Sequence, residues 1–212
     1  MKTLFKFGMV ATALIVFCLT VAFTFGASAA EEAYNRGVTA QDRGDLQEAI
    51  KQYTEAIKLD PKLAPAYNNR GNAYDELGDT SKAIADYDQA TKLDPSNAKA
   101  YYNRGLAYSN LGDKNKAIAD YNQAIKLDPN LALAYSNRGN AYDELGDTSK
   151  AIADYDQAIK IDPNLALAYS NRGLAYFNLG DYKSATKDAR KACELGDCEG
   201  LQYLEQKNLL SD

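Results

Sequence analysis

Histidine and tryptophan are both missing from this chain of 212 residues. Without histidine the chain lacks the commonest general base, and this excludes the usual catalytic triads and most zinc sites. The remaining residues form no glycine-rich phosphate loop, no metal-ligand cluster and no nucleophile–base pair. We therefore expect a protein that is not an enzyme and that holds no metal and no cofactor.

Positive charge is also scarce, since 24 lysines and arginines stand against 29 acidic residues, for a net charge of -5. No basic cluster is evident along the sequence after residue 30. An acidic chain repels phosphate backbones, so we expect no nucleic-acid partner. Because tryptophan is absent, aromatic packing must fall mainly to the 16 tyrosines.

The first 29 residues have the composition of a targeting segment. Lys2 and Lys6 precede an apolar run at residues 7–25, and Ala27-Ser28-Ala29 follows it. Small residues before a cleavage point are typical of a signal peptide, so we expect cleavage after Ala29. The alternative is an uncleaved membrane anchor, because the run is barely long enough to span a bilayer. Both interpretations place residues 30–212 outside the cytoplasm, in the periplasm or a similar compartment, and only the anchor brings the protein to a membrane.

The rest of the chain is built on a period of 34 residues. Glycines recur at this interval, as Gly37, Gly71, Gly105, Gly139 and Gly173. Prolines recur in register with them, as Pro61, Pro95, Pro129 and Pro163. Two such series in register predict a solenoid of stacked structural repeats.

Each repeat contains the patterns of two helices, as residues 64–97 illustrate. In the first helix the apolar face is marked by Tyr67, Arg70, Gly71 and Tyr74, spaced at i, i+3, i+4 and i+7. A second apolar face follows at Ala83, Ile84, Tyr87, Ala90 and Leu93. Between them, Gly78 suits the left-handed end of a helix and Asp79 or Thr80 can cap the next. The Asp94-Pro95 pair should end the second helix.

Glycine inside a helix costs about 1 kcal/mol relative to alanine, so Gly71 and its equivalents call for a structural reason. We expect the small residues Gly71, Ala83 and Ala90 to let the two helices touch, with tyrosines filling the spaces above and below. One helix pair cannot bury its apolar face alone, and stacking on the next pair buries it.

The order Tyr-x2-Arg-Gly-x2-Tyr, Ala-x3-Tyr and Pro resembles the tetratricopeptide repeat, here in an exported, bacterial-type chain. The resemblance implies an all-α solenoid, a right-handed superhelix of five helix-turn-helix units in which first helices line a concave groove. It also implies a protein-interaction module. The units would be 30–63, 64–97, 98–131, 132–165 and 166–199, followed by a capping segment at 200–212. Thr186, Ala189 and Asp197 depart from the pattern in the last unit, as expected of an end cap.

An arginine lies on the apolar face of every first helix, as Arg36, Arg70, Arg104, Arg138 and Arg172. These side chains could grip the carboxylates of a partner. We favour a structural role, because a buried charge needs a built-in partner. The arginines would stack on tyrosines and pair with the acids of second helices, namely Asp86, Asp120, Asp154 and Asp188.

Asparagines lie beside this face, as Asn35, Asn69, Asn103, Asn137 and Asn171. In members of the family that bind extended peptides, this column can hydrogen-bond the peptide main chain, and asparagine offers both a donor and an acceptor. The alternative is a solvated polar stripe. We expect these residues, from Asn69 onward, to belong to a peptide-binding groove.

Two nearly identical repeats would make parts of this groove acidic. The acidic sets are Asn72, Asp75 and Glu76, and Asn140, Asp143 and Glu144. We therefore expect the partners to be extended segments of other proteins, with neutral or basic ones favoured.

Cys193 and Cys198 remain as an even pair once Cys18 leaves with the signal segment, so a disulfide between them is expected in an oxidising compartment. The alternative is a buried free thiol at Cys193.

The function that the sequence favours is a scaffold or adaptor binding extended segments. The alternatives are an assembly factor that acts through its convex face or its ends, and a non-catalytic subunit of an enzyme complex.

Overall fold

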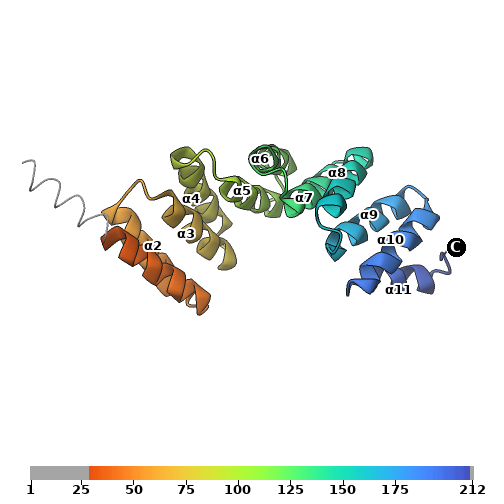
Figure 1. Cartoon of the computed structure of the whole chain (residues 1–212), viewed down its shortest axis with the longest axis horizontal. Helices are drawn as coiled ribbons and strands as arrows, with labels where there is room; N and C mark the ends of the chain where they lie inside the picture. The colour runs from red at the N-terminus through yellow and green to blue at the C-terminus, as the bar shows by residue number, and fades with distance from the viewer. Residues whose placement is uncertain (1–28, 211–212) are drawn as a thin grey trace, which may run out of the picture. The chain divides into compact units, whose positions relative to one another are not determined.

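The computed structural model describes residues 29–210, and the chain divides into two compact units, Met1–Pro95 and Ser96–Asp212. The first unit has a helical stretch at 29–42, then α2 (Leu46–Leu59), α3 (Ala64–Glu76) and α4 (Thr80–Leu93). The second unit contains α5 (Ala98–Asn110), α6 (Lys114–Leu127), α7 (Ala132–Glu144), α8 (Thr148–Ile161), α9 (Ala166–Asn178), α10 (Tyr182–Glu194) and α11 (Glu199–Gln206). Figure 1 shows these paired helices, and the predicted all-helical repeat fold is confirmed.

The predicted signal segment, apart from Ala29, lies outside the described residues. Within residues 29–210, none of the helices combines the length and the apolar character needed to cross a bilayer.

The turn between the two helices of a repeat follows the predicted chemistry. Gly78 has a φ of +81°, a left-handed conformation that side chains other than glycine rarely adopt. Asp79 then caps α4 by accepting a hydrogen bond from the backbone N–H of Lys82. The helix ends at Leu93, immediately before Asp94-Pro95. These local signals set the ends of both helices.

The helices of the second unit form two layers. Each first helix packs on its own second helix, and the first helices α5, α7 and α9 also contact one another. The second helices α6 and α8 contact the following first helix, but in the described part of the chain second helices do not contact each other. The first helices therefore form an inner layer, and the second helices form an outer layer that spreads apart.

A tyrosine on each of the first four second helices fills the space over the repeated glycine. A Cβ atom added to Gly71 would lie 2.7 Å from Cε1 of Tyr87, and Gly139 has the same relation to Tyr155. The small residues therefore leave space for a tyrosine ring that packs directly on the glycine. They do not serve the direct contact between the two helices, with rings above and below, that the sequence suggested. Burying such a ring contributes about 1.5–3 kcal/mol, which exceeds the cost of about 1 kcal/mol for glycine in a helix.

The last repeat lacks this ring, because Ala189 occupies the corresponding position of α10. Helix α11 covers part of the exposed face, and its Leu204 is buried against Ala185 and Ala189. Leu201 and Leu209 pack against the same cluster. The segment after residue 199 thus closes the apolar end of the second unit.

Candidate functional site

The arginines of the first helices are held inside their own repeats. Arg138 donates to both carboxylate oxygens of Asp154, from Nε at 2.8 Å and from Nη2 at 2.6 Å. The same bidentate pairing joins Arg70 to Asp86, Arg104 to Asp120 and Arg172 to Asp188. In the first repeat Arg36 bonds instead to the amide oxygen of Gln52, because glutamine occupies the aspartate position there.

Tyrosines complete the surroundings of these arginines. The guanidinium of Arg138 lies 5.4 Å from the ring centre of Tyr135 and 6.0 Å from that of Tyr142. The bond to Asp188 raises the pKa of Arg172. The structural role predicted for the arginines is confirmed from the second repeat onward, where an aspartate matches each charge, whereas Arg36 is exposed and bonds to a neutral glutamine.

The asparagine column links neighbouring repeats. The amide of Asn69 donates to the hydroxyl of Tyr34 at 3.0 Å, and Asn137 donates to Tyr102 at the same distance. Asn103 lies half-buried on α5. At these positions the amide nitrogen serves the stack, and the Oδ1 oxygen of Asn137 is the atom left for a ligand.

Asn171 is the exception in this column. Ser136 stands where a tyrosine would meet its amide, and the serine is too short to do so. Both the Asn171 amide nitrogen and the Ser136 hydroxyl are buried without a hydrogen-bond partner among the described residues. Buried polar atoms of this kind are normally satisfied, so the asparagine column does not link the fourth and fifth repeats as Asn69 and Asn137 link earlier ones.

Asn72 and Asn140 also serve the core. Their amide oxygens accept hydrogen bonds from the hydroxyls of Tyr87 and Tyr155, at 2.8 and 2.7 Å. Burial raises the pKa of both tyrosines, and the carboxylates of Asp75 and Asp143 add to the effect. In the third repeat Leu106 replaces the asparagine, and the Tyr121 hydroxyl is buried without a hydrogen bond, although Ser109 lies nearby.

The four acids of the candidate set differ in how far they are paired. Glu76 accepts a hydrogen bond from Gln41, and Glu144 forms an ion pair with Lys114 at 2.8 Å. Asp75 and Asp143 are half-exposed, and their carboxylates have neither a hydrogen bond nor an ion pair among the described residues. Each first helix with this sequence therefore carries one paired and one unpaired carboxylate near its carboxyl end.

The last repeat contains an apolar pocket that the sequence analysis did not anticipate. It has a volume of about 70 Å³ and is lined by Ser170, Gly173, Leu174, Phe177, Ala185, Ala189, Ala192, Gly200, Tyr203 and Leu204. The pocket lies where the buried tyrosine of other repeats would sit. The signal for it was Ala189, which we interpreted only as part of an end cap.

The expectation that the chain has no basic cluster after residue 30 is wrong. Lys183, Lys187, Arg190 and Lys191 are separated along the sequence, but the helical period brings them onto one face of α10. This face belongs to the outer layer of the second unit.

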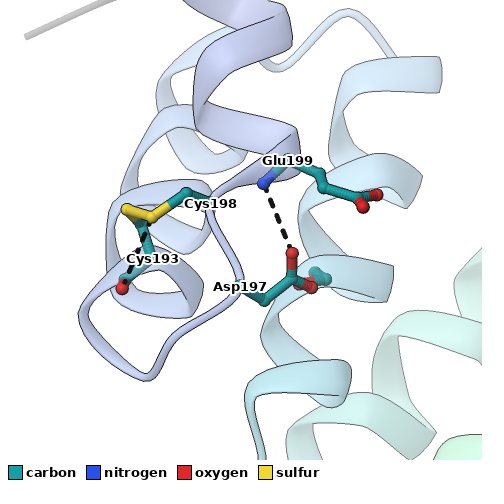
Figure 2. Close-up of a disulfide and its surroundings, with 5 residues drawn as sticks. Cys193, Asp197, Cys198 and Glu199 are labelled. Carbon is teal, nitrogen blue, oxygen red and sulfur yellow. Dashed lines mark hydrogen bonds between the residues drawn. A yellow bond between two sulfur atoms is a disulfide. The ribbon is translucent and has the colours of Figure 1, made fainter.

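Cys193 and Cys198 are joined by a disulfide with a Cα–Cα distance of 4.0 Å (Figure 2). Helix α10 ends at Glu194, and the chain turns back at Gly196, where φ is +104°. Asp197 accepts hydrogen bonds from the backbone N–H of Glu199 and from the Ser170 hydroxyl. The disulfide therefore lies at the junction of α10 and α11, beside the apolar pocket.

Comparison with known families identifies these repeats. The profile described as "TPR repeat" matches residues 42–78, 71–112 and 139–180. Three profiles described as "Tetratricopeptide repeat" match residues 98–131, 120–153 and 166–196. The chain belongs to the tetratricopeptide repeat family.

Solved structures of tetratricopeptide repeat proteins agree with this assignment. A crystal structure of MamA is 32% identical, covers 81% of this chain and 96% of its own, and has a TM-score of 0.71. A second MamA structure is 30% identical, with coverages of 87% and 97% and a TM-score of 0.72. YrrB, described as a TPR protein with an unusual peptide-binding site, shares the fold at 22% identity, with coverages of 82% and 90% and a TM-score of 0.70. No curated protein sequence matches the chain.

Proposed function

We propose that the protein is a non-enzymatic scaffold that binds extended segments of other proteins along its first helices. The observation that carries the proposal is the charge balance of these helices. From the second repeat onward their arginines are matched by aspartates of second helices, whereas the carboxylates of Asp75 and Asp143 have no partner among the described residues. The charge left for a ligand is therefore negative, which favours neutral or basic segments.

Electrostatic attraction of this kind adds selectivity and faster association, and salt weakens it. Affinity should be modest, because an extended segment loses conformational freedom when it binds. Helix α7, which ends in Asp143 and Glu144, also carries Asn137, and we propose its Oδ1 oxygen as an acceptor for a main-chain N–H.

The apolar pocket of the last repeat supplies a place for one side chain of the bound segment. Its volume of about 70 Å³ is about half that of a cavity known to hold benzene, so a branched aliphatic side chain fits better than a ring. Leu174 is 56% exposed beside it, which keeps apolar surface open to a ligand. The peptide-binding site described for YrrB, a protein of the same fold, is consistent with this use of the repeats.

The proposal is tested by changing the two unpaired carboxylates to amides, in the double variant Asp75→Asn and Asp143→Asn. Arrayed peptides of about 12 residues, long enough to span a few repeats when extended, would be compared at low and high salt. We expect the variant to lose the preference for basic peptides and most of the salt dependence. Retention of both by the variant would exclude the first helices as the site.

A matched control is available in Glu55→Gln and Glu205→Gln, which change net charge by the same amount outside the first helices. Glu205 is exposed, and the Glu55 side chain is 46% exposed and pairs with Lys58 on the surface of α2. This control should bind like the parent. If it loses the basic preference equally, only the overall charge matters and no specific surface is involved.

We also propose that the protein is exported and cleaved after Ala29, on the grounds of the apolar run and the Ala27-Ser28-Ala29 sequence. Intact-mass measurement of the exported protein tests this. A species that retains residues 1–29 in the membrane fraction would instead support the membrane anchor.

A further inference from the structure

Helix α10 differs in charge from the second helices of the preceding repeats. At four outward positions α8 carries Ser149, Ala153, Asp156 and Gln157, whereas α10 carries Lys183, Lys187, Arg190 and Lys191. The matching positions of α4 and α6 contain no lysine or arginine either, and those of α2 contain only Lys51. We call these four residues of α10 the basic face. Helix α10 differs from α8 at most other positions too, but the gain of four cations outweighs the loss of Lys150 and Lys160, whose places hold Ser184 and Glu194.

Three of the four cations of the basic face have no ion pair among the described residues. Lys183, Lys187 and Arg190 are exposed, and their side chains form no hydrogen bond or ion pair within the described residues. Lys191 pairs with Glu194 at 2.9 Å, on the surface of the same helix. The neighbouring Arg172 adds no free charge, because it bonds to both Asp188 and Asp156.

The fold itself does not call for these cations. Like charges at i, i+3 and i, i+4 destabilise a helix, and Lys187 has such a relation to all three others. Lys183 also lies in the first turn of α10, where the helix dipole disfavours positive charge. Repulsion without internal compensation indicates a role outside the folded chain.

The position of Arg190 in the last repeat explains why an arginine can replace the aspartate of the preceding repeat. In the fourth repeat the equivalent Asp156 bonds to Arg172 of the next repeat. After α10 the position of the next arginine is occupied by Gln206, so an aspartate would have no structural partner. At the end of the stack, position 190 therefore does not need an aspartate that bonds to a following repeat.

A hollow of about 850 Å³ adjoins the basic face. Besides the four cations, its lining consists of Ile159, Tyr169, Arg172, Ser184, Asp188 and Glu194. Asp188 is paired with Arg172 and Glu194 with Lys191, so Lys183, Lys187 and Arg190 remain as excess positive charge. All of these residues belong to the second unit. A concave surface with apolar side chains beside lysines fits a polypeptide better than a flat lipid headgroup layer, because side chains of the ligand can enter it.

We propose that the basic face of α10 and the adjoining hollow bind an acidic polypeptide segment. The surface is opposite in charge to the first helices and lies on the outer layer, so it is separate from the site proposed above. With both sites the scaffold would hold two kinds of partner, one basic or neutral and one acidic.

The test uses the full chain and an oligoglutamate peptide labelled for fluorescence anisotropy, with oligoglutamine as the uncharged reference. We expect salt-sensitive binding of oligoglutamate only. The double variant Lys187→Ala and Arg190→Ala should bind about tenfold more weakly, since it removes two surface charge contacts. The matched control is Lys126→Ala and Lys160→Ala, which removes two exposed lysines from other second helices and should bind like the parent.

Three results would overturn the proposal. The parent could fail to prefer oligoglutamate over oligoglutamine, or the control could lose binding as much as the α10 variant. The parent could also bind phosphatidylglycerol vesicles or single-stranded DNA more tightly than oligoglutamate, which would assign the face to phosphate groups. The Asp75→Asn and Asp143→Asn variant should bind oligoglutamate like the parent or more tightly, so failure of this inference and failure of the proposed function are distinguishable.

Discussion

The fourth and fifth repeats contain the same two helices but have different neighbours. In the fourth, Tyr155 packs against Ala175 of the next repeat, and Asp156 bonds to Arg172 of that repeat. In the fifth, the equivalent positions hold Ala189 and Arg190. The arginine–aspartate pair, which lies within one repeat, is present in both. Contacts within a repeat are thus kept at the end of the stack, whereas contacts to a following repeat are replaced.

The largest effect on stability should come from the arginine–aspartate pair, which both repeats keep. Asp154→Ala leaves the guanidinium of Arg138 partly buried without its main partner, so we expect a loss of about 3–5 kcal/mol in the free energy of unfolding. Gln52→Ala in the first repeat should cost only about 1 kcal/mol, because Arg36 is exposed and water can replace the hydrogen bonds that Gln52 makes with Arg36 and Glu48. Urea unfolding of both variants measures the difference, and equal losses would show that the buried pair is unimportant.

The next largest effect is a difference in stability between substitutions of the repeated glycine in the two repeats, Gly139 and Gly173. Gly139→Ala places a Cβ 2.7 Å from a ring carbon of Tyr155, so repacking should destabilise the protein by about 2 kcal/mol even after the gain in helix propensity. At Gly173 the nearest atom is Cβ of Asp188, at 3.3 Å, and Gly173→Ala should change stability by less than about 0.5 kcal/mol. The comparison uses thermal and urea unfolding. Comparable destabilisation by both substitutions would contradict the role given to the tyrosine ring.

The disulfide of the fifth repeat has no counterpart in the fourth, where Asp162 and Pro163 follow α8. The closed loop is short, so Cys193→Ser with Cys198→Ser should lower stability by no more than about 2 kcal/mol. Hydrogen exchange should locate the loss in α11 and the end of α10. Full maleimide labelling of both thiols in denatured parent protein without reductant would show that the bond does not form.

The smallest effect concerns the hydroxyls of the buried tyrosines. Tyr155→Phe removes the hydrogen bond to Asn140 and should cost about 1 kcal/mol. Tyr121→Phe removes a buried hydroxyl that has no hydrogen bond among the described residues, so it should cost nothing or stabilise slightly. A loss at Tyr121 as large as at Tyr155 would indicate that an ordered water satisfies the Tyr121 hydroxyl.

The sequence predicted the repeats, the helix ends and the arginine–aspartate pairs, because each follows from spacing within one repeat. Gly78 and Asp79 act over a single turn, and Arg70 and Asp86 lie on the two helices of one pair. The candidate asparagines were harder to interpret. The hydroxyls that hold Asn69 and Asn137 lie 35 residues earlier in the chain, in the preceding repeat.

By itself the sequence determined a stack of helix pairs, since helical periodicity and turn residues act locally and recur every 34 residues. Only the tertiary structure decided which polar groups remain for a partner. The Asn72 oxygen meets a tyrosine hydroxyl, whereas the Asp75 carboxylate one turn later meets none. It also brought the four cations of α10 beside one hollow. The physical reason is that hydrogen bonding and burial depend on which side chains reach one another across helices, and spacing along one helix does not contain that information.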